Sequence, residues 1–281
     1  MPLRPYACAN CGHWQRYFAP PPDCPVCTDT RNDLPEDGWR FLTVEEVRAT
    51  LRGQWRRPRE DMVAFSVIPP LGLNGTGWLL LHQEGNVAFE AAPFYTDDML
   101  AEIERLGGIR FLAASHVHGY GALWQLQDAF RPEALAIQKE DLRLTKAFRA
   151  TWPYDNALEL LPGLTLYHVG GHYEGQAVLH DSRRRILFCG DAFKVDQDAA
   201  GNNLAVSTHK AFHKAIPLTP AEIRRYRATI APLDFDTVCT PFEHAPGITR
   251  AIALAVLDEQ LSGPPRVRHI PIDELRGRAA R

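Results

Sequence analysis

The segment Ile109-Arg-Phe-Leu-Ala-Ala-Ser115-His116-Val117-His118-Gly119-Tyr120-Gly121 joins a short apolar run to a pair of histidines. The run at its start predicts a buried β-strand, and the glycines at its end predict a loop. Histidines at positions i and i+2 just past a strand end direct both imidazoles to one side, where they can bind the same metal ion. The segment therefore predicts a metal-binding loop at the end of a strand.

Three further segments place a histidine or an aspartate in the same position relative to a strand. Gly170-Gly171-His172, Cys189-Gly190-Asp191 and Phe242-Glu243-His244 each follow an apolar run that predicts a strand. A lone histidine after a strand is usually solvated or hydrogen-bonded. Four comparable positions in one chain instead favour a shared metal centre.

The rest of the main body alternates short apolar runs with helical patterns, which is typical of a layered α/β domain. Strands are predicted at 62–68, 78–81, 87–89, 109–114, 164–169, 177–180, 186–189 and 237–240. Helices are predicted at 97–106, 139–150, 220–230 and 248–261.

The order of these motifs resembles that of the metallo-β-lactamase fold superfamily, and the resemblance covers about residues 62–250. It comprises an HxH motif, a GGH motif, a strand ending in GD and a last histidine. The stretch Asn86–Glu90 resembles the early strand of the family, which ends in an aspartate-rich turn, with Glu90 in place of aspartate. The resemblance implies an αββα sandwich with the metal site at one edge of two packed sheets.

The sequence departs from the family at its best-known motif. HxHxDH reads His116-Val-His118-Gly-Tyr120-Gly121, so the aspartate and the final histidine are replaced. In the resembling enzymes those two residues hold a second metal ion.

The resemblance implies that a first metal ion is bound by His116, His118 and His172, with Asp191 alongside. For a second ion only Asp191 and His244 remain, and two protein ligands are fewer than a firm site normally has. We therefore expect one metal ion, zinc or iron, with an open position for water.

Such a centre predicts a hydrolase acting on a small molecule with an ester, thioester, lactone, amide or phosphoester bond. A zinc ion held by three imidazoles lowers the pKa of its water to about 7. Asp191 is expected to orient that water or accept its proton. His244 is expected to serve as a fourth ligand, a proton shuttle or an oxyanion donor. Tyr120 either donates to a developing oxyanion or fills the volume of the absent second metal.

Four of the six cysteines form two pairs near the N-terminus, Cys8-Ala-Asn-Cys11 and Cys24-Pro-Val-Cys27. Two such pairs supply four thiolates to one tetrahedral metal ion, whose binding would stabilise a segment too short for its own core. The alternatives are free thiols or two disulfides. The segment resembles zinc ribbons and the rubredoxin-like module of rubrerythrins. We expect structural zinc, with iron as the alternative.

The chain of 281 residues is expected to form two domains, a four-cysteine ribbon with its linker at 1–38 and the main α/β domain at 39–281. The longest apolar run, Ala251–Leu257, is too short to span a membrane, and the N-terminus has no apolar signal stretch. We therefore expect a cytoplasmic protein without a membrane partner. A net charge of −3 provides no overall basis for nucleic-acid binding.

Two other functional classes remain open. A non-haem iron oxidoreductase, with the ribbon as an electron relay, would resemble the flavodiiron proteins, although Val117 stands where those have a glutamate. A non-catalytic binding protein with a degenerate metal site would use the four-cysteine module to bind a protein partner.

Two lesser features are interpreted as surface structure. His209 and His213 are four residues apart and would share the face of a surface helix, with lining of the pocket as the alternative. The basic stretch Gln54–Arg59 predicts a solvated loop.

Overall fold

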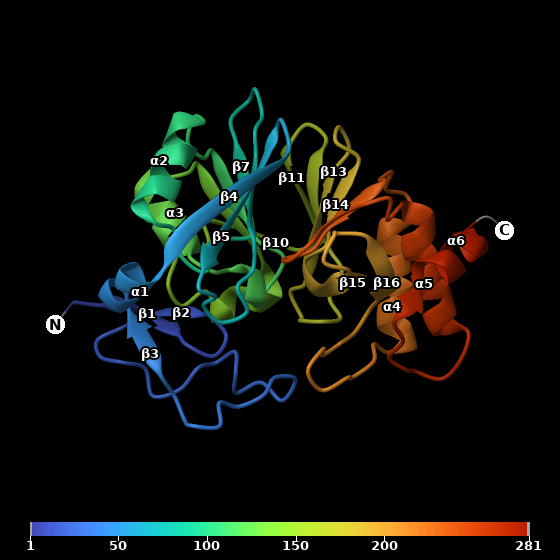
Figure 1. Ribbon diagram of the computed structural model, residues 1–281, viewed down its shortest axis with the longest axis horizontal. Helices are drawn as coiled ribbons and strands as arrows, with labels where there is room; N and C mark the ends of the chain where they lie inside the picture. Colours follow the sequence, from blue (N-terminus) through green and yellow to red (C-terminus); the bar gives the residue numbers. More distant parts are fainter. Residues whose placement is uncertain (1, 280–281) are drawn as a thin grey trace. The chain divides into compact units, whose positions relative to one another are not determined.

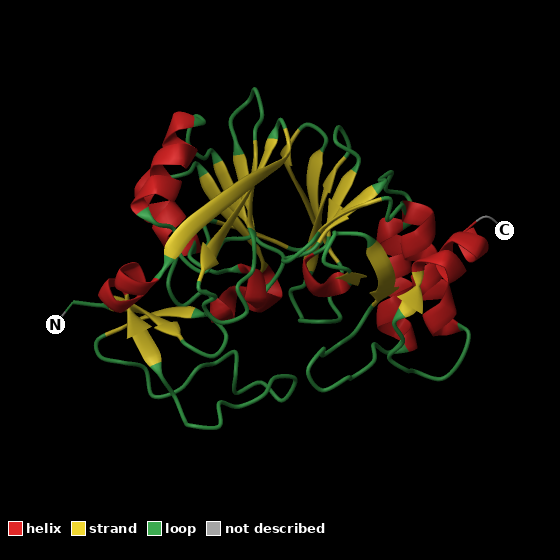
Figure 2. Ribbon diagram, viewed as in Figure 1, coloured by secondary structure: helices red, strands yellow, loops and turns green. Residues whose placement is uncertain are grey.

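The computed structural model describes residues 2–279, which form two compact units divided between Tyr154 and Asp155. Each unit combines a mixed β-sheet with α-helices (Figures 1 and 2), so the predicted α/β class is confirmed. Within residues 2–279, no helix has the length and apolar character needed to cross a membrane.

The first unit contains a small antiparallel sheet and a large mixed sheet. In the small sheet the strand order is β2 (Trp14–Tyr17), β1 (Arg4–Cys8) and β3 (Phe41–Thr43). In the large sheet it is β10 (Trp152–Tyr154), β9 (Ala134–Gln138), β8 (Phe111–Ala113), β7 (Val87–Phe89), β6 (Gly77–Leu80), β5 (Met62–Ile68) and β4 (Arg52–Arg59). Strands β7 to β10 pair in parallel and β4 to β7 antiparallel.

The helices of the first unit are α1 (Val44–Thr50), α2 (Asp97–Arg105) and α3 (Leu123–Phe130). Figure 1 shows α2 and α3 along one face of the large sheet. Thr43 and Glu46 form a complete capping box at the start of α1, which satisfies amide groups that a helix end leaves open.

The second unit has a six-stranded sheet and a three-stranded sheet. The first has the order β11 (Ala157–Leu161), β12 (Leu164–His168), β13 (Ala177–Asp181), β14 (Ile186–Phe188), β17 (Thr237–Cys239) and β18 (His244–Pro246). The second has the order β15 (Lys194–Gln197), β16 (Asn203–Ser207) and β19 (Ile270–Pro271). Only β14 and β17 pair in parallel among the described strands of this unit.

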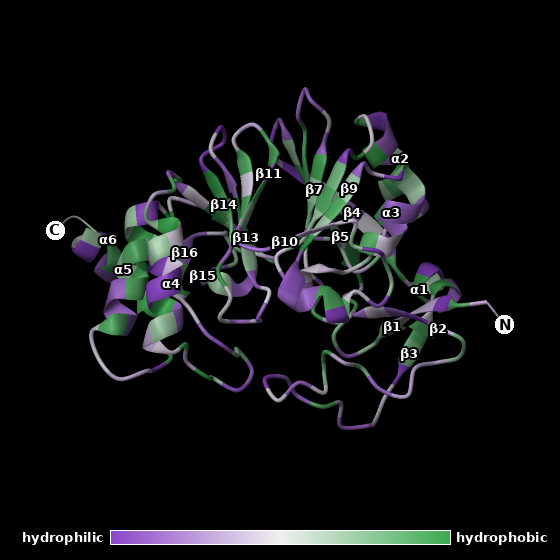
Figure 3. Cartoon of the chain, turned by 180° about the vertical axis from the view of Figure 1, so that it is seen from behind, coloured by the Kyte–Doolittle hydropathy of each residue, from purple (hydrophilic) through white to green (hydrophobic). Residues whose placement is uncertain are grey.

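Helices α4 (Pro220–Ile230), α5 (Arg250–Leu261) and α6 (Ile272–Ala279) complete the second unit. Its core joins sheet residues such as Val178 and Val238 to helix residues such as Tyr226 and Val256. Helix α5 is apolar on most of its surface (Figure 3) because α4 and α6 both pack against it.

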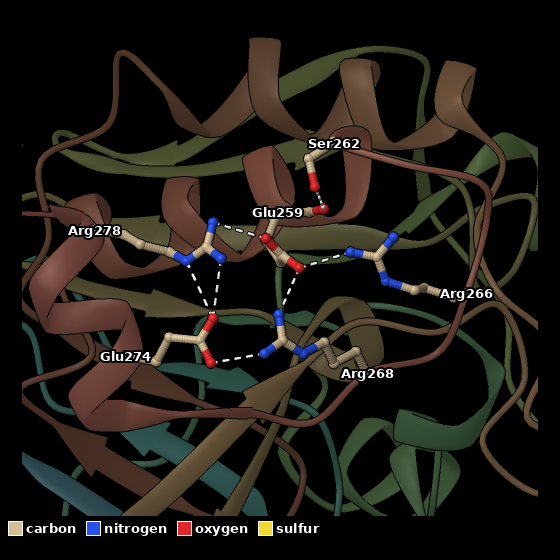
Figure 4. Close-up of polar contacts among 6 residues, drawn as sticks. All are labelled: Glu259, Ser262, Arg266, Arg268, Glu274 and Arg278. Carbon is tan, nitrogen blue, oxygen red and sulfur yellow. Dashed lines mark hydrogen bonds and ion pairs between the residues drawn. The ribbon is translucent and has the colours of Figure 1, made fainter.

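A buried carboxylate ties α6 to α5. Glu259 on α5 is 5% exposed, and it accepts contacts from Arg266 at 2.7 Å, Arg268 at 2.5 Å and Arg278 at 2.7 Å (Figure 4). Burial alone would raise the pKa of Glu259, but hydrogen bonds from Arg266 and Arg268 outweigh it and hold that pKa below its ordinary value. Glu274 of α6 pairs with the same Arg268 and Arg278.

Most of the predicted elements are present within a residue or two, but three expectations are wrong. The predicted helix at 139–150 is only a short 3-10 segment, Lys139–Leu144. The segment with His209 and His213 is no helix, because Lys210 N–H donates to Ile216 O in a tight turn. The basic stretch Gln54–Arg59 lies in strand β4 at the sheet edge, where its exposed side chains stay solvated without a loop.

Several elements have no counterpart among the predictions, and α3 and β3 are two of them. Helix α3 was not predicted because its buried residues are consecutive, Leu123 to Leu126, and show no helical period. Strand β3 lies after the expected domain boundary at residue 38, yet it pairs with β1, which lies before it. The division at 38/39 stays a prediction.

Candidate metal centres

The four N-terminal cysteines form the first candidate centre. Cys8 Sγ lies 3.9 Å from Cys27 Sγ, and Cys11 Sγ lies 3.6 Å from Cys24 Sγ. Sulfurs bound about 2.3 Å from a tetrahedral metal ion lie about 3.8 Å apart, whereas a disulfide holds them at about 2.05 Å. None of the six cysteines forms a disulfide within residues 2–279. The spacing therefore fits a four-thiolate metal site and not two disulfides.

The thiols of the cluster shift one another's pKa in opposite directions: hydrogen bonds, that with Cys24 first, raise the pKa of Cys11. Hydrogen bonds within the cluster, those with Cys11 first, lower the pKa of Cys8 and Cys27. Asn10 Nδ2 also donates to Cys27 Sγ at 3.3 Å. Thiolate is the form that binds a metal ion, so the ribbon (residues 4–27) suits zinc or iron equally well by donor type.

The loop Ser115–Gly121, here called the metal loop, positions two histidines. Strand β8 ends at Ala113, and the loop closes in a 3-10 turn, Val117–Gly119, with Gly119 N–H donating to His116 O at 3.0 Å. The rings of His116 and His118 lie 5.0 Å apart between centroids. The two imidazoles are brought together by this turn and not by the pleat of an extended strand, as their spacing had suggested.

His116 is oriented by a neighbour that sequence reasoning did not single out. Ser115 Oγ lies 2.8 Å from His116 Nδ1, and both residues are 1% exposed. A hydrogen bond at Nδ1 fixes the ring and leaves Nε2 as the metal-binding atom. Because serine is common in turns, the sequence carried no signal for this role.

The side chain of Glu90 contacts the backbone of the metal loop. Its side chain is buried, and Glu90 Oε1 accepts a hydrogen bond from Ser115 N at 3.3 Å. The carboxylate lies so close to Gly119 that a Cβ there would overlap it. A side chain at position 119 would therefore force the carboxylate of Glu90 to move.

The second unit contributes a buried histidine–aspartate pair. His172 Nε2 lies 3.3 Å from Asp191 Oδ2, and the two residues are 3% and 8% exposed. Two ligands about 2.1 Å from a tetrahedral metal ion lie about 3.4 Å apart. The pair thus has the separation that shared coordination of one ion requires.

Both members of this pair are held by short loops after strands. The amide of His172 donates to the hydroxyl of Tyr226 at 3.2 Å, so helix α4 anchors the GGH loop. Asp191 lies in the 3-10 turn Gly190–Ala192 directly after β14. Thr208 Oγ1 donates to Ala192 O at 2.7 Å and ties this turn to the segment after β16.

Outside the cysteine cluster, the candidate metal ligands among the described residues are His116 and His118 in the first unit and His172 and Asp191 in the second. The donor set of three imidazoles and one carboxylate suits zinc or non-haem iron. His244 is not in this group. It begins strand β18, where its carbonyl oxygen accepts from Gln197 Nε2 at 3.2 Å.

Tyr120 is enclosed in the interior of the first unit. It is 2% exposed, its ring lies 5.2 Å from that of Phe148, and its hydroxyl has no hydrogen-bond partner there. Burial, and then the neighbouring Asp141, Tyr154 and Glu90, raise the pKa of Tyr120 well above its ordinary value. The burial favours the volume-filling alternative over the oxyanion donor.

Histidine 209 is buried although a surface position was expected. His209 Nε2 lies 2.8 Å from Ser207 Oγ, and its ring lies 4.6 Å from Phe212. Phe212 in turn contacts the ring of His172 at 5.3 Å. Burial, followed by nearby positive groups, lowers the pKa of His209 to about 4, so it is neutral at pH 7.

No protein-family model matches the chain. The uncharacterized protein YmaE of Bacillus subtilis (strain 168) is 28% identical over 246 residues, covering 84% of this chain and 88% of that protein. Two solved structures share the fold. The metallo-β-lactamase FIM-1 from Pseudomonas aeruginosa, in its mono-zinc form, matches with a TM-score of 0.54 and 12% identity, over 76% of this chain and 98% of its own.

The second structure is the rubredoxin oxygen:oxidoreductase from Desulfovibrio gigas, with a TM-score of 0.53 and 14% identity. That match covers 74% of this chain and 61% of the oxidoreductase. At such low identity these similarities establish the arrangement of the backbone only.

Proposed function

We propose that this chain, which has the metallo-β-lactamase fold with an N-terminal four-cysteine cluster, is a metal-dependent hydrolase of a small-molecule substrate. In this proposal His116, His118, His172 and Asp191 bind a single metal ion. The carrying observation is the buried contact of 3.3 Å between His172 Nε2 and Asp191 Oδ2, which matches two ligands of one ion.

Support for a single ion comes from the metal loop. Tyr120 and Gly121 occupy the positions where the resembling enzymes hold a second ion, and neither is a ligand of the kind zinc prefers. The fold match to a metallo-β-lactamase in a mono-zinc form is consistent with this fold binding one ion.

The protein side chains would divide the work of hydrolysis. A bound divalent metal ion supplies Lewis-acid chemistry and lowers the pKa of water. Ser115 orients His116, and the Tyr226 hydroxyl holds the amide of His172, so both imidazoles are fixed before substrate arrives. Besides binding the ion, Asp191 would orient the attacking water and accept its proton.

Glu243 is a second carboxylate near Asp191. Burial, opposed by a hydrogen bond from Thr240 and reinforced by the charge of Asp191, raises the pKa of Glu243. The carboxyl group of Glu243 accepts a hydrogen bond from Thr240 Oγ1, which fixes it in the loop after β17.

The test combines elemental analysis with assays. Wild type is expected to hold two metal ions per chain, Cys8→Ser/Cys11→Ser one, and His116→Ala/His172→Ala one. A panel of a chromogenic aryl ester, a thioester, a lactone and an aryl phosphodiester is then assayed. We expect turnover of at least one substrate to fall at least about 100-fold in His172→Ala. Two ions remaining in the cysteine variant would contradict the single-ion centre.

An iron oxidoreductase is the second candidate, because four thiolates accompany a fold shared with the rubredoxin oxygen:oxidoreductase. Iron in the cysteine site would give a coloured protein that bleaches on reduction, whereas zinc is colourless and redox-inert. A colourless protein with unchanged absorption after dithionite excludes this candidate.

A purely binding protein would keep its partner affinity in His172→Ala.

A further inference from the structure

The ribbon is seated directly on the part of the first unit that carries the metal loop. The indole of Trp14 in β2 is 1% exposed, and its Nε1 donates to Pro93 O at 2.8 Å. The same ring lies 6.2 Å from Phe94 and 5.2 Å from Trp124 of α3. One side chain of the ribbon therefore contacts the segment 90–95 and the helix that follows the metal loop.

The segment Glu90–Tyr95, here called the bridging segment, is bonded to the metal loop and to residues 122–125 that follow it. Ala91 N–H donates to Gly119 O at 2.9 Å, and Ala92 O accepts from Ala122 N at 2.9 Å. At its ends Glu90 bonds to Ser115, and Tyr95 exchanges two hydrogen bonds with Gln125 of α3. Displacing the bridging segment would therefore displace the metal loop.

A second contact joins the turn Cys8–Gly12, here called the knuckle, to residues 71–73 of the same unit. Cys11 O accepts a hydrogen bond from Leu73 N at 3.4 Å. Gly72 has φ +57°, and a Cβ there would overlap the backbone of Cys11 and Gly12. The knuckle that holds Cys11 is thus packed backbone to backbone against residues 71–73.

His13 lies where the knuckle meets the metal loop. It is 5% exposed, neither ring nitrogen has a hydrogen-bond partner within residues 2–279, and His118 is among the groups that act on its charge. A cavity of about 10 Å³, the space of one water molecule, is lined by His13, Cys11, Val117, His118 and Gly121. A Cβ at Gly121 would overlap the carbonyl oxygens of Ala91 and Ala92, so the bridging segment approaches the metal loop closely there as well.

We propose that the ribbon is a positioning element of the metal loop, so that a metal ion in the four-cysteine site raises the affinity of the histidine site for its own ion. Trp14 is the positioning residue that transmits this effect through the bridging segment. The inference rests on the proposed function in one respect: His116 and His118 must bind a metal ion.

The two sites are coupled because the ribbon is ordered by the metal ion that it binds. A segment of this length has too little core of its own, so thiolate coordination holds Trp14 and His13 in place. Without that ion the ribbon loosens, the Pro93 hydrogen bond is lost, and the metal loop samples geometries that bind an ion poorly. Coupling between two binding sites is reciprocal, so each ion raises the affinity for the other by the same factor.

The test measures Co²⁺ affinity of the histidine site in the full chain, with zinc kept in the ribbon. Trp14→Phe keeps the aromatic ring but removes the indole donor. We expect it to weaken Co²⁺ binding roughly 2- to 10-fold, the effect of one hydrogen bond. Trp55→Phe, at a partly exposed tryptophan of edge strand β4, is the matched control and is expected to bind like wild type.

Cys24→Ser, which removes the ribbon ion, is expected to weaken Co²⁺ binding at least about 5-fold. The reciprocal measurement needs no mutation: zinc affinity of the ribbon is compared with Co²⁺ present or absent at the histidine site, and the factor of increase should equal the coupling found above. Cobalt bound by nitrogen and oxygen lacks the intense charge-transfer bands of cobalt thiolate, so the two sites are distinguished by absorption.

The possible outcomes separate the inference from the proposed function. If Trp14→Phe lowers the melting temperature but leaves Co²⁺ affinity and spectrum as in wild type, the residue is merely structural and the inference is overturned. If wild type binds no Co²⁺ outside the ribbon, the proposed function fails instead.

Discussion

At the scale of single residues, the metal loop depends on side chains that are not themselves ligands. Ser115 holds the ring of His116, and Glu90 holds the backbone of Ser115. Such supporting contacts orient an imidazole before the ion arrives, so their loss weakens binding without removing a ligand.

Ser115→Ala is therefore expected to weaken metal binding at the histidine site about 10-fold, because His116 loses the hydrogen bond at Nδ1. The measurement is a competition titration against a chromogenic chelator. Ser182→Ala, at an exposed serine that bonds to Gly163 O, is the matched control. Equal affinity in both variants and wild type would show that the ring needs no such support.

Tyr120→Phe is expected to leave turnover within about twofold of wild type and the free energy of unfolding nearly unchanged. Within the described residues 2–279 its buried hydroxyl has no hydrogen-bond partner, so removing it costs little. Steady-state kinetics and urea unfolding check the two statements. A fall in turnover of 100-fold or more would identify the hydroxyl as an oxyanion donor after all.

At the scale of elements, the C-terminal helix is attached by charge as well as by apolar packing. Ile272 and Leu275 of α6 lie in the core of the second unit, while three arginines around Glu259 close the polar side (Figure 4). A carboxylate as buried as Glu259 is stable only while those partners remain.

Glu259→Gln is expected to lower the free energy of unfolding by about 1–3 kcal/mol. The expected loss is at the low end of what breaking a buried ion pair costs. The arginines are about 35–42% exposed, so water screens their charges. Urea unfolding at pH 7 measures the difference. Glu104→Gln on the exposed face of α2 is the control and is expected to change it by less than about 0.5 kcal/mol.

The difference in the free energy of unfolding between wild type and Glu259→Gln should also depend on pH, and the sign of this dependence can be predicted. Because the arginines hold the pKa of Glu259 below its ordinary value, its stabilisation is full above the unfolded-state pKa of about 4.3. The stabilisation is lost as the pH falls through the folded-state pKa. The difference between wild type and Glu259→Gln should therefore be constant near pH 7 and shrink below about pH 4; a difference that grows in acid would contradict this account.

At the scale of the whole molecule, folding and metal binding are linked. Each candidate centre gathers its ligands from separated segments, so the unfolded chain lacks the site and a bound ion stabilises the folded state. The ribbon depends on this most, because residues 4–27 are short.

Metal removal is accordingly expected to lower the melting temperature, and added zinc to restore it. Once free zinc exceeds the dissociation constant of a site, each further tenfold increase adds about 1.4 kcal/mol per site to the free energy of unfolding. Differential scanning calorimetry over a series of zinc buffers measures the slope. Mg²⁺, which prefers oxygen ligands, is the control, and a melting temperature independent of zinc would refute the linkage.

Much of the architecture was predictable because local patterns and burial agreed. Strands β5 and β7 and helix α4 match their predicted bounds, since each combines a clear hydrophobic pattern with turn or capping residues at its ends. Helix α3 and the segment 139–150 failed for the opposite reason. Their surroundings in the fold, and not their own periodicity, decide their conformation.

The sequence by itself determined which side chains are candidate metal ligands, that the body is α/β, and that residues 116–121 depart from the HxHxDH motif of the resembling enzymes. Those properties follow from residue type and short spacing, which the chain carries locally. Only the tertiary structure decided that Ser115 orients His116, that Tyr120 is buried, and that Trp14 seats the ribbon on the bridging segment. Each of these contacts depends on which atoms packing brings within about 3 to 6 Å, and the pattern of a single stretch of sequence does not contain that information.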